Sequence, residues 1–301
     1  MNILHKRLLF FILFYSVGSF VNAQEVDLFT EKAEKTKDIT TATFKSSRVI
    51  NGQSIENVGN GVLDLKILHR FGNINQGAYN LFGLDQASMR IGLDYGINNR
   101  LMIGLGRSTF EKQYDGFFKF KLIQQQTGIR NIPLSVSLAS TIIYKSLKDP
   151  INTTYTLYAS DKFSYANQLI IARKFNDYFS LQLTPTLVHY NLVANSTMPN
   201  DFKSLGISFR QRISKRVNFT TEYFYRIDKL DGYNDPLTLG LDIETGGHVF
   251  QLHVTNSTGM TERTFINETT GSWSNKDVRF GFNITRAFTL KKPKELRNTK
   301  W

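Results

Sequence analysis

The chain has 301 residues, including 24 Phe and 13 Tyr, with no Cys and a formal net charge of +12 at pH 7. Without Cys the sequence excludes disulfide bonds, thiolate metal sites and a lipid-modified cysteine. The basic excess is compatible with anionic lipid headgroups or anionic solutes as partners.

The first 23 residues have the pattern of a signal peptide. A charged start ending at Arg7 is followed by an apolar run from Leu8 to Val21 and by small residues ending at Ala23. The run is shorter than the roughly 20 residues that a membrane-spanning helix needs. We therefore expect cleavage after Ala23 and export, and an exported chain is not expected to bind nucleic acid.

Residues 24–60 form a polar N-terminal segment whose role the sequence leaves open. Its first half mixes Lys and Glu, and Thr43 to Asn60 combines a strand-like stretch, TFKSSRVI, with the turn formers of NGQSIENVGNG. Turn formers of this kind interrupt regular structure. The segment is interpreted as a linker, an extra strand or a plug inside a barrel.

Residues 87–110 contain the clearest structural unit, a β-hairpin. Apolar side chains at 89, 91, 93, 95 and 97 alternate with Arg, Gly and Asp, and Asn98 and Asn99 then reverse the chain. A period of two places the apolar side chains on one face and the polar ones on the other.

The same alternation recurs from residue 61 to 290 and predicts a single all-β domain, followed by a basic tail at 291–301. Short and long connections alternate along it, which is typical of an up-and-down transmembrane β-barrel in an outer membrane. A soluble sandwich also alternates, but charges at strand centres and this asymmetry of connections favour the barrel. Pro185 is expected to mark a bulge. We predict 12 strands, near residues 61–71, 87–97, 101–108, 118–122, 133–144, 163–175, 179–187, 205–212, 217–223, 239–244, 250–254 and 279–288.

The polar faces of these strands carry the candidate functional residues, because they would line the lumen. The set contains eight basic and five acidic residues: Asp64, Lys66, Arg70, Arg90, Asp94, Lys119, Lys121, Arg210, Arg212, Glu222, Asp242, Glu244 and Arg279. A basic lining lowers the energy of anions, which predicts a narrow passive or selective pore for small solutes, anions among them. The competing interpretation is that these charges pair and fill the lumen, since barrels of eight strands are filled and wide channels occur near sixteen.

A second functional hypothesis is a closed barrel that presents its extracellular loops to a protein partner. Two long connections, Gly72 to Gln86 and Ser257 to Lys276, are then the expected contact surfaces. Outer-membrane lipid surrounds the barrel in either case.

The sequence contains no recognisable catalytic motif, and we expect no enzyme activity, no cofactor and no metal site. It has no nucleophile elbow, no phosphate-binding loop and no paired histidines at zinc spacing. Gly104 and Gly106 are too few for a nucleotide loop and are expected to relieve crowding on the inner wall. A third hypothesis, a lipid-modifying enzyme, depends on His189 or His253, and neither has a convincing nucleophile nearby in sequence.

Two stretches, HRFGNINQGAYNLFGLDQASMRIGLDYGI and LMIGLGRSTFEKQYDGFFKFKL, carry a family resemblance. The chain resembles the membrane-bound β-barrel proteins of unknown function from Gram-negative Bacteroidota. The most specific parts are residues 69–72, 104–107 and 112–116. The resemblance implies an outer-membrane barrel and carries over no catalytic residues.

Overall fold

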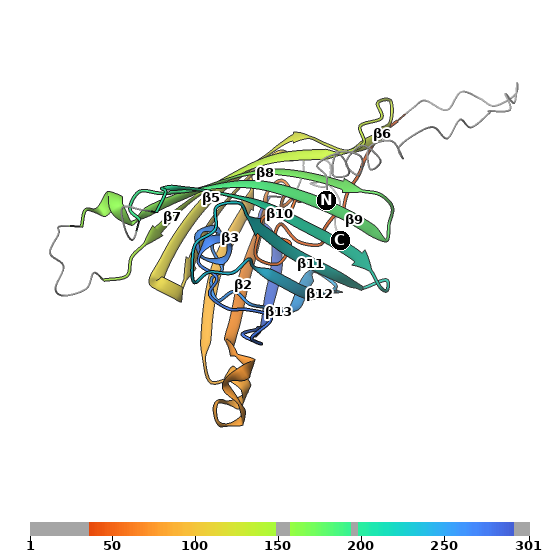
Figure 1. The fold of residues 1–301 in the computed structure, drawn as a ribbon. Helices are drawn as coiled ribbons and strands as arrows, with labels where there is room; N and C mark the ends of the chain where they lie inside the picture. The colour runs from red at the N-terminus through yellow and green to blue at the C-terminus, as the bar shows by residue number, and fades with distance from the viewer. Residues whose placement is uncertain (1–35, 149–156, 194–197, 292–301) are drawn as a thin grey trace, which may run out of the picture. The chain divides into compact units, whose positions relative to one another are not determined.

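The computed structural model describes residues 36–148, 157–193 and 198–291, so the expected signal peptide, its cleavage site and nearly all of the basic tail lie outside it. Twelve antiparallel strands form a closed barrel in which sequence neighbours pair and β14 pairs with β2 (Figure 1). The predicted up-and-down β-barrel is confirmed. The strands are β2 (Val62–Asn73), β3 (Ala87–Gly96), β4 (Leu101–Ser108), β5 (Gln113–Ile123), β7 (Ser135–Lys145), β8 (Phe163–Lys174), β9 (Phe179–Tyr190), β10 (Asp201–Arg212), β11 (Val217–Arg226), β12 (Leu237–Thr245), β13 (His248–Thr255) and β14 (Arg279–Thr289).

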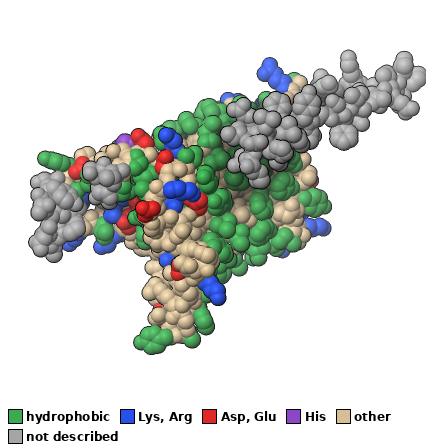
Figure 2. Space-filling model, viewed as in Figure 1, with side chains coloured by type: hydrophobic (Ala, Val, Ile, Leu, Met, Phe, Trp, Pro, Cys, Tyr) green, Lys and Arg blue, Asp and Glu red, His purple; other side chains and the backbone are tan. Residues whose placement is uncertain are grey.

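The barrel has an apolar outer face and a polar inner face. In β3, Ile91 and Leu93 are each 45% exposed, whereas Arg90 and Asp94 are fully buried. Hydrophobic side chains cover much of the outer surface of the strands in Figure 2. This is the reverse of a soluble domain, in which apolar side chains would fill the interior.

The connections at the two ends of the barrel differ in length. Residues 97–100, 175–178, 213–216 and 246–247 make short turns at the end where β2 begins and β14 ends, which we call the inner end. The fifth inner connection holds β6 (Gln126–Gly128), which pairs with β1 (Lys37–Ile39) outside the barrel. The connections at the opposite, outer end are mostly longer, and they contain the short helical turns η1 (Ile74–Gln76), η2 (Ala78–Gly83), η3 (Phe110–Lys112), η4 (Ala159–Lys162) and η5 (Arg263–Asn267).

None of the helices in the described part of the chain has the length and apolar character needed to cross a bilayer.

Pro185 does not produce the expected bulge. The pairing of β8 with β9 keeps one register on both sides of it, with Gln168 opposite Thr186 and Ile171 opposite Leu183. Proline removes one N–H donor, but the missing bond alone does not force an extra residue into the strand. Register shifts occur elsewhere, next to Gly281 and near Lys121.

Candidate functional site

The barrel lumen is occupied by residues 43–60, which we call the lumen hairpin. It enters at the inner end, where Asn57 Nδ2 donates to Arg100 O at 2.9 Å. Its tip is a tight turn in which Val49 N–H donates to Gly52 O at 2.9 Å. Phe44, Val49, Ile50 and Ile55 are all at most 2% exposed. Of the polar N-terminal segment that the sequence left open between linker, strand and plug, residues 43–60 therefore lie inside the barrel, as a plug.

The tip of the lumen hairpin is bound by one carboxylate of the wall. Glu222 on β11 accepts from three successive backbone N–H groups, those of Ile50 (3.4 Å), Asn51 (3.3 Å) and Gly52 (2.8 Å). Successive N–H groups of a turn form a concave anion-binding site. Gly52 suits this approach because a Cβ there would lie 3.1 Å from the ring of Phe224.

Basic side chains of the wall bind carbonyl and amide oxygens along the hairpin. Arg70 Nη2 donates to Asn51 Oδ1 at 2.6 Å. Lys119 Nζ donates to two backbone oxygens of the hairpin stem, at 2.9 and 2.8 Å, and Arg210 Nε donates to Thr43 O at 2.7 Å. Lys119 and Arg210 therefore satisfy backbone carbonyl groups of the hairpin, which would otherwise be buried without partners.

The other buried candidates form contacts within the wall or with the hairpin. Arg90 pairs with Asp115 through two hydrogen bonds, a geometry that makes strong, oriented ion pairs. Lys66 lies 2.7 Å from Asp64 Oδ2 and donates to Ser46 Oγ at 3.0 Å. The remaining two buried acids, Asp94 and Asp242, accept from Ser47 Oγ at 2.8 Å and from Thr220 Oγ1 at 2.7 Å, respectively.

Four of the thirteen candidates lie nearer the mouths and are only partly buried: Lys121, Arg212, Glu244 and Arg279. Glu244 Oε1 lies 2.7 Å from Lys45 Nζ, and Arg279 Nη1 donates to Asn256 O at 3.1 Å. The other nine are buried and engaged as described above. The structure therefore brings most of the thirteen candidates together, but they surround the lumen hairpin and do not line an open lumen.

Residues 256–278, which we call the outer plug loop, fold into the lumen from its other end. Met260, Phe265 and Ile266 are fully buried, and the ring of Phe265 meets that of Phe224 edge to face at 5.3 Å. The expectation that Ser257 to Lys276 forms a contact surface is wrong for most of this loop, because its central residues fold into the barrel. Apolar side chains within a polar loop were the signal that the sequence offered for this.

The two plugging segments meet at a buried ion pair. Arg48 Nη1 of the lumen hairpin lies 3.2 Å from Glu262 Oε1 of the outer plug loop, and the two side chains are 2% and 0% exposed. The Arg48 guanidinium also lies 5.6 Å from the centroid of the Phe117 ring. Neither Arg48 nor Glu262 was among the sequence candidates, because both lie outside the predicted strands.

Buried charges in the described residues nearly balance. The buried set contains seven basic residues (Arg48, Lys66, Arg70, Arg90, Lys119, Arg210 and Arg226) and six acidic ones (Asp64, Asp94, Asp115, Glu222, Asp242 and Glu262). Arg226 has a further partner in Asp235, 3.1 Å away. These buried charges therefore do not amount to the strong basic excess that would concentrate anions.

The glycines of β4 make room for the lumen contents, as expected. A Cβ on Gly106 would lie 2.2 Å from Arg90 Nη2, and one on Gly104 would lie 2.3 Å from the ring of Phe117. The side chains of Arg90 and Phe117 therefore fit against the inner face of β4 only because Gly104 and Gly106 have no side chain.

The two histidines considered for catalysis lie in different environments. His189 lies in an exposed contact with Asp201, 2.8 Å from Nδ1 to Oδ1. His253 is buried in the lumen, where a Cβ on Gly281 would lie 2.4 Å from its Nε2 atom. These contacts do not form a base and nucleophile pair.

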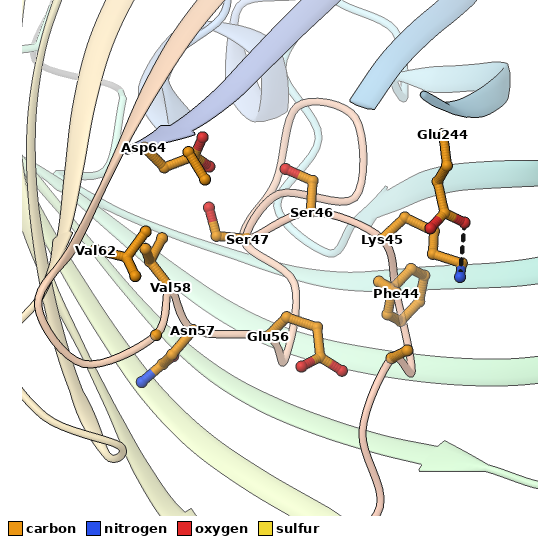
Figure 3. Close-up of a pocket in the computed structure, with 13 residues that line it drawn as sticks. Phe44, Lys45, Ser46, Ser47, Glu56, Asn57, Val58, Val62, Asp64 and Glu244 are labelled. Carbon is orange, nitrogen blue, oxygen red and sulfur yellow. Dashed lines mark ion pairs between the residues drawn. The ribbon is translucent and has the colours of Figure 1, made fainter. Parts of the chain in front are cut away.

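A cavity remains at each end of the plugged lumen. The inner one has a volume of about 340 Å³ and lies between the lumen hairpin and the wall. Phe44, Glu56 and Asp64 line it, and the Lys45–Glu244 ion pair lies at its edge (Figure 3). The outer cavity, of about 350 Å³, lies among the loops and includes Arg263 and Glu268 of the outer plug loop.

Comparison with solved structures finds other β-barrels at low similarity. The NanC porin is 8% identical, with a TM-score of 0.47, over 75% of this chain and 98% of that one. The KdgM porin is 10% identical at the same TM-score, over 75% of this chain and 99% of that one. OmpF from Salmonella typhi, in complex with daunomycin, is 9% identical with a TM-score of 0.37, over 75% and 97%. Nothing about solutes follows from likenesses this distant.

No curated protein matches the chain. The family described as "membrane bound beta barrel domain" (DUF5777) matches residues 44–288, which include the lumen hairpin from Phe44 as well as nearly all of the barrel. This match agrees with the family resemblance of the sequence and with the closed barrel of the structure. The chain belongs to this family of membrane-bound β-barrel domains.

Proposed function

We propose that this protein is an outer-membrane barrel that is closed to solutes at rest and acts through its loop end, as a binding platform. The observation that carries the proposal is the bound lumen hairpin: its turn donates three N–H groups to Glu222, and Lys119 and Arg70 bind its stem and its tip. A segment bound by this many wall side chains is an integral part of the folded barrel. No enzymatic role is proposed.

A gated pore for small solutes is the second candidate. The two cavities favour it, because they approach the plugged layer from opposite ends of the barrel. The hairpin is also held in the lumen by non-covalent contacts to polar wall side chains, so a displaced hairpin would leave a hydrophilic wall behind it. The balance of buried charges gives no support to an anionic preference.

Conductance in planar bilayers tests the proposal. We compare the full mature chain with a variant that lacks residues 43–60, using barrels whose folding is verified by heat-modifiable migration in gels. The full chain is expected to give no stable current steps, whereas the deletion opens the lumen and gives them. Stable steps of similar size from both proteins would contradict closure.

A matched pair of point variants separates the hairpin from general effects of charge. Glu222→Gln weakens the acceptor at the hairpin tip and is expected to give transient openings. Glu244→Gln removes the same charge from the inner mouth, where Glu244 contacts Lys45, and is expected to stay silent. Equal openings from both variants would mean that the tip contact does not hold the plug.

A further inference from the structure

The outer cavity lies where several connections at the loop end converge. Its volume is about 350 Å³, within the range of small-molecule sites. The connection after β4 contributes Phe110 and Glu111, and β7 ends at it with Lys145. Leu230 comes from the connection after β11, and Arg263 comes from the outer plug loop. Different segments therefore form one concavity rather than a groove within a single loop.

One side of the cavity is apolar and ordered by packing. The rings of Tyr190 and Phe202 meet edge to face at 5.3 Å, and Val193, Met198 and Leu230 pack against this cluster. Such a wall buries an aliphatic or aromatic group favourably.

The other side carries four charged groups in two ion pairs. Lys145 Nζ contacts Glu111 Oε1, and Arg263 Nε lies 2.9 Å from Glu268 Oε1. The Arg263 guanidinium also lies 4.9 Å from the centroid of the Tyr190 ring, which joins the charged side to the apolar one. Burial raises the pKa of Glu268, and the nearby Arg263 opposes that rise. The cavity therefore offers two positive and two negative groups and no net charge.

This charge pattern selects among ligand classes. A simple anion meets Glu111 and Glu268 beside the basic groups, and a simple cation meets Lys145 and Arg263 beside the acidic ones, so neither gains a net attraction. A wholly apolar ligand would remove both ion pairs from water without adding any polar contact to them. A molecule that carries one charge of each sign beside an apolar group satisfies both sides of the cavity.

We propose that the outer cavity binds a small zwitterion with an apolar side chain, of the chemical class of aliphatic and aromatic amino acids. The apolar side chain packs against Leu230 and the Tyr190–Phe202 pair, the ammonium group binds Glu111 or Glu268, and the carboxylate binds Lys145 or Arg263. This assignment rests on the proposed role of the loop end as a binding platform and names the ligand class for it.

Calorimetric titration of the full mature protein in detergent micelles tests this with four probes. L-Phenylalanine has all three features, phenylacetate lacks the ammonium group, phenethylamine lacks the carboxylate, and glycine lacks the apolar group. We expect L-phenylalanine to bind at least tenfold more tightly than each of the other three. Equal affinity for phenylacetate or phenethylamine, or no binding of L-phenylalanine, would overturn the assignment.

Variants then locate the site. Arg263→Gln and Leu230→Asp are expected to weaken L-phenylalanine binding at least tenfold, because they change the charged and the apolar side respectively. Lys276→Gln, in the same outer plug loop but outside the cavity lining, is expected to bind as the wild type does. Unchanged binding in both cavity variants would place the site elsewhere and overturn the proposal.

Failure of this assignment and failure of closure give different results. A barrel that gives no conductance and binds none of the four probes overturns the ligand assignment alone. A barrel that conducts at rest and still prefers L-phenylalanine overturns closure alone.

Discussion

The lumen hairpin and the outer plug loop both fill the barrel, but different contacts hold them. The backbone of the hairpin is bound mostly by wall side chains, such as Glu222 and Lys119. The outer plug loop also contacts the wall, where Thr261 Oγ1 donates to Gln113 Oε1 at 2.5 Å, but it has turns of its own as well: Thr269 Oγ1 donates to Phe265 O at 2.7 Å, and Thr261 Oγ1 lies 2.9 Å from Thr264 Oγ1. The hairpin therefore depends mostly on the barrel for its conformation, whereas the loop combines contacts to the barrel with local turns.

Two reporters can follow the two segments separately. Because the sequence has no Cys, a Ser54→Cys variant places a single thiol in the buried hairpin. The chain has two Trp residues, so Trp301→Phe leaves Trp273 as the only one. Trp273 belongs to the outer plug loop, and its Nε1 donates to Leu237 O at 3.1 Å.

The largest effect is expected from Glu222→Ala, which should release the hairpin and leave the loop in place. Three buried N–H groups lose their acceptor, at a cost of about 1–3 kcal/mol for each group left unpaired. The thiol at position 54 should then react with a maleimide many times faster, while Trp273 emission stays unchanged. A simultaneous change in Trp273 would show that the segments unfold as one unit.

Phe265→Ala is expected to loosen the outer plug loop and to leave the lumen hairpin in place. Phe265 is fully buried against Phe224, and truncation of a buried Phe costs about 3–5 kcal/mol. We expect a red shift of Trp273 emission and easier proteolysis of the loop, with little change in labelling at position 54. If the hairpin thiol becomes equally reactive, the loop does not fold independently of the hairpin.

The ion pair between Arg48 and Glu262 measures how strongly the two segments are coupled. A double-mutant cycle with Arg48→Gln and Glu262→Gln should give a coupling of about 1–3 kcal/mol in the free energy of unfolding in vesicles. The two single variants should each destabilise the protein more than the double variant does, because each leaves a buried charge unpaired. Strictly additive effects would mean that the segments plug the lumen independently.

The smallest effect is expected from Lys45→Gln at the inner mouth. Lys45 and Glu244 are 19% and 36% exposed, and a partly solvated pair of this kind contributes below about 1 kcal/mol. Labelling at position 54 and Trp273 emission should both match the wild type. Marked exposure of the thiol would show that the hairpin is held at its entrance rather than at its tip.

Much of the fold and part of the site could be predicted because they follow from a local pattern. The period-two alternation of residues such as Arg90 and Ile91 assigned inner and outer faces, and nine of the thirteen lumen candidates are buried in the structure. The partners of those residues could not be predicted. Glu222 lies 170 residues from Gly52, and a polar segment rich in turn formers carries no periodicity that indicates where it packs.

The sequence by itself therefore determined the strand order, the direction of each face and the membrane-bound class, because alternation and turn residues act over a few neighbouring positions. Only the tertiary structure decided that the lumen is filled, that Arg48 meets Glu262, and that the loop end contains a charge-balanced cavity. Those features depend on which distant polar groups satisfy one another once the barrel closes. That choice is made by three-dimensional proximity, which the linear pattern of residues does not contain.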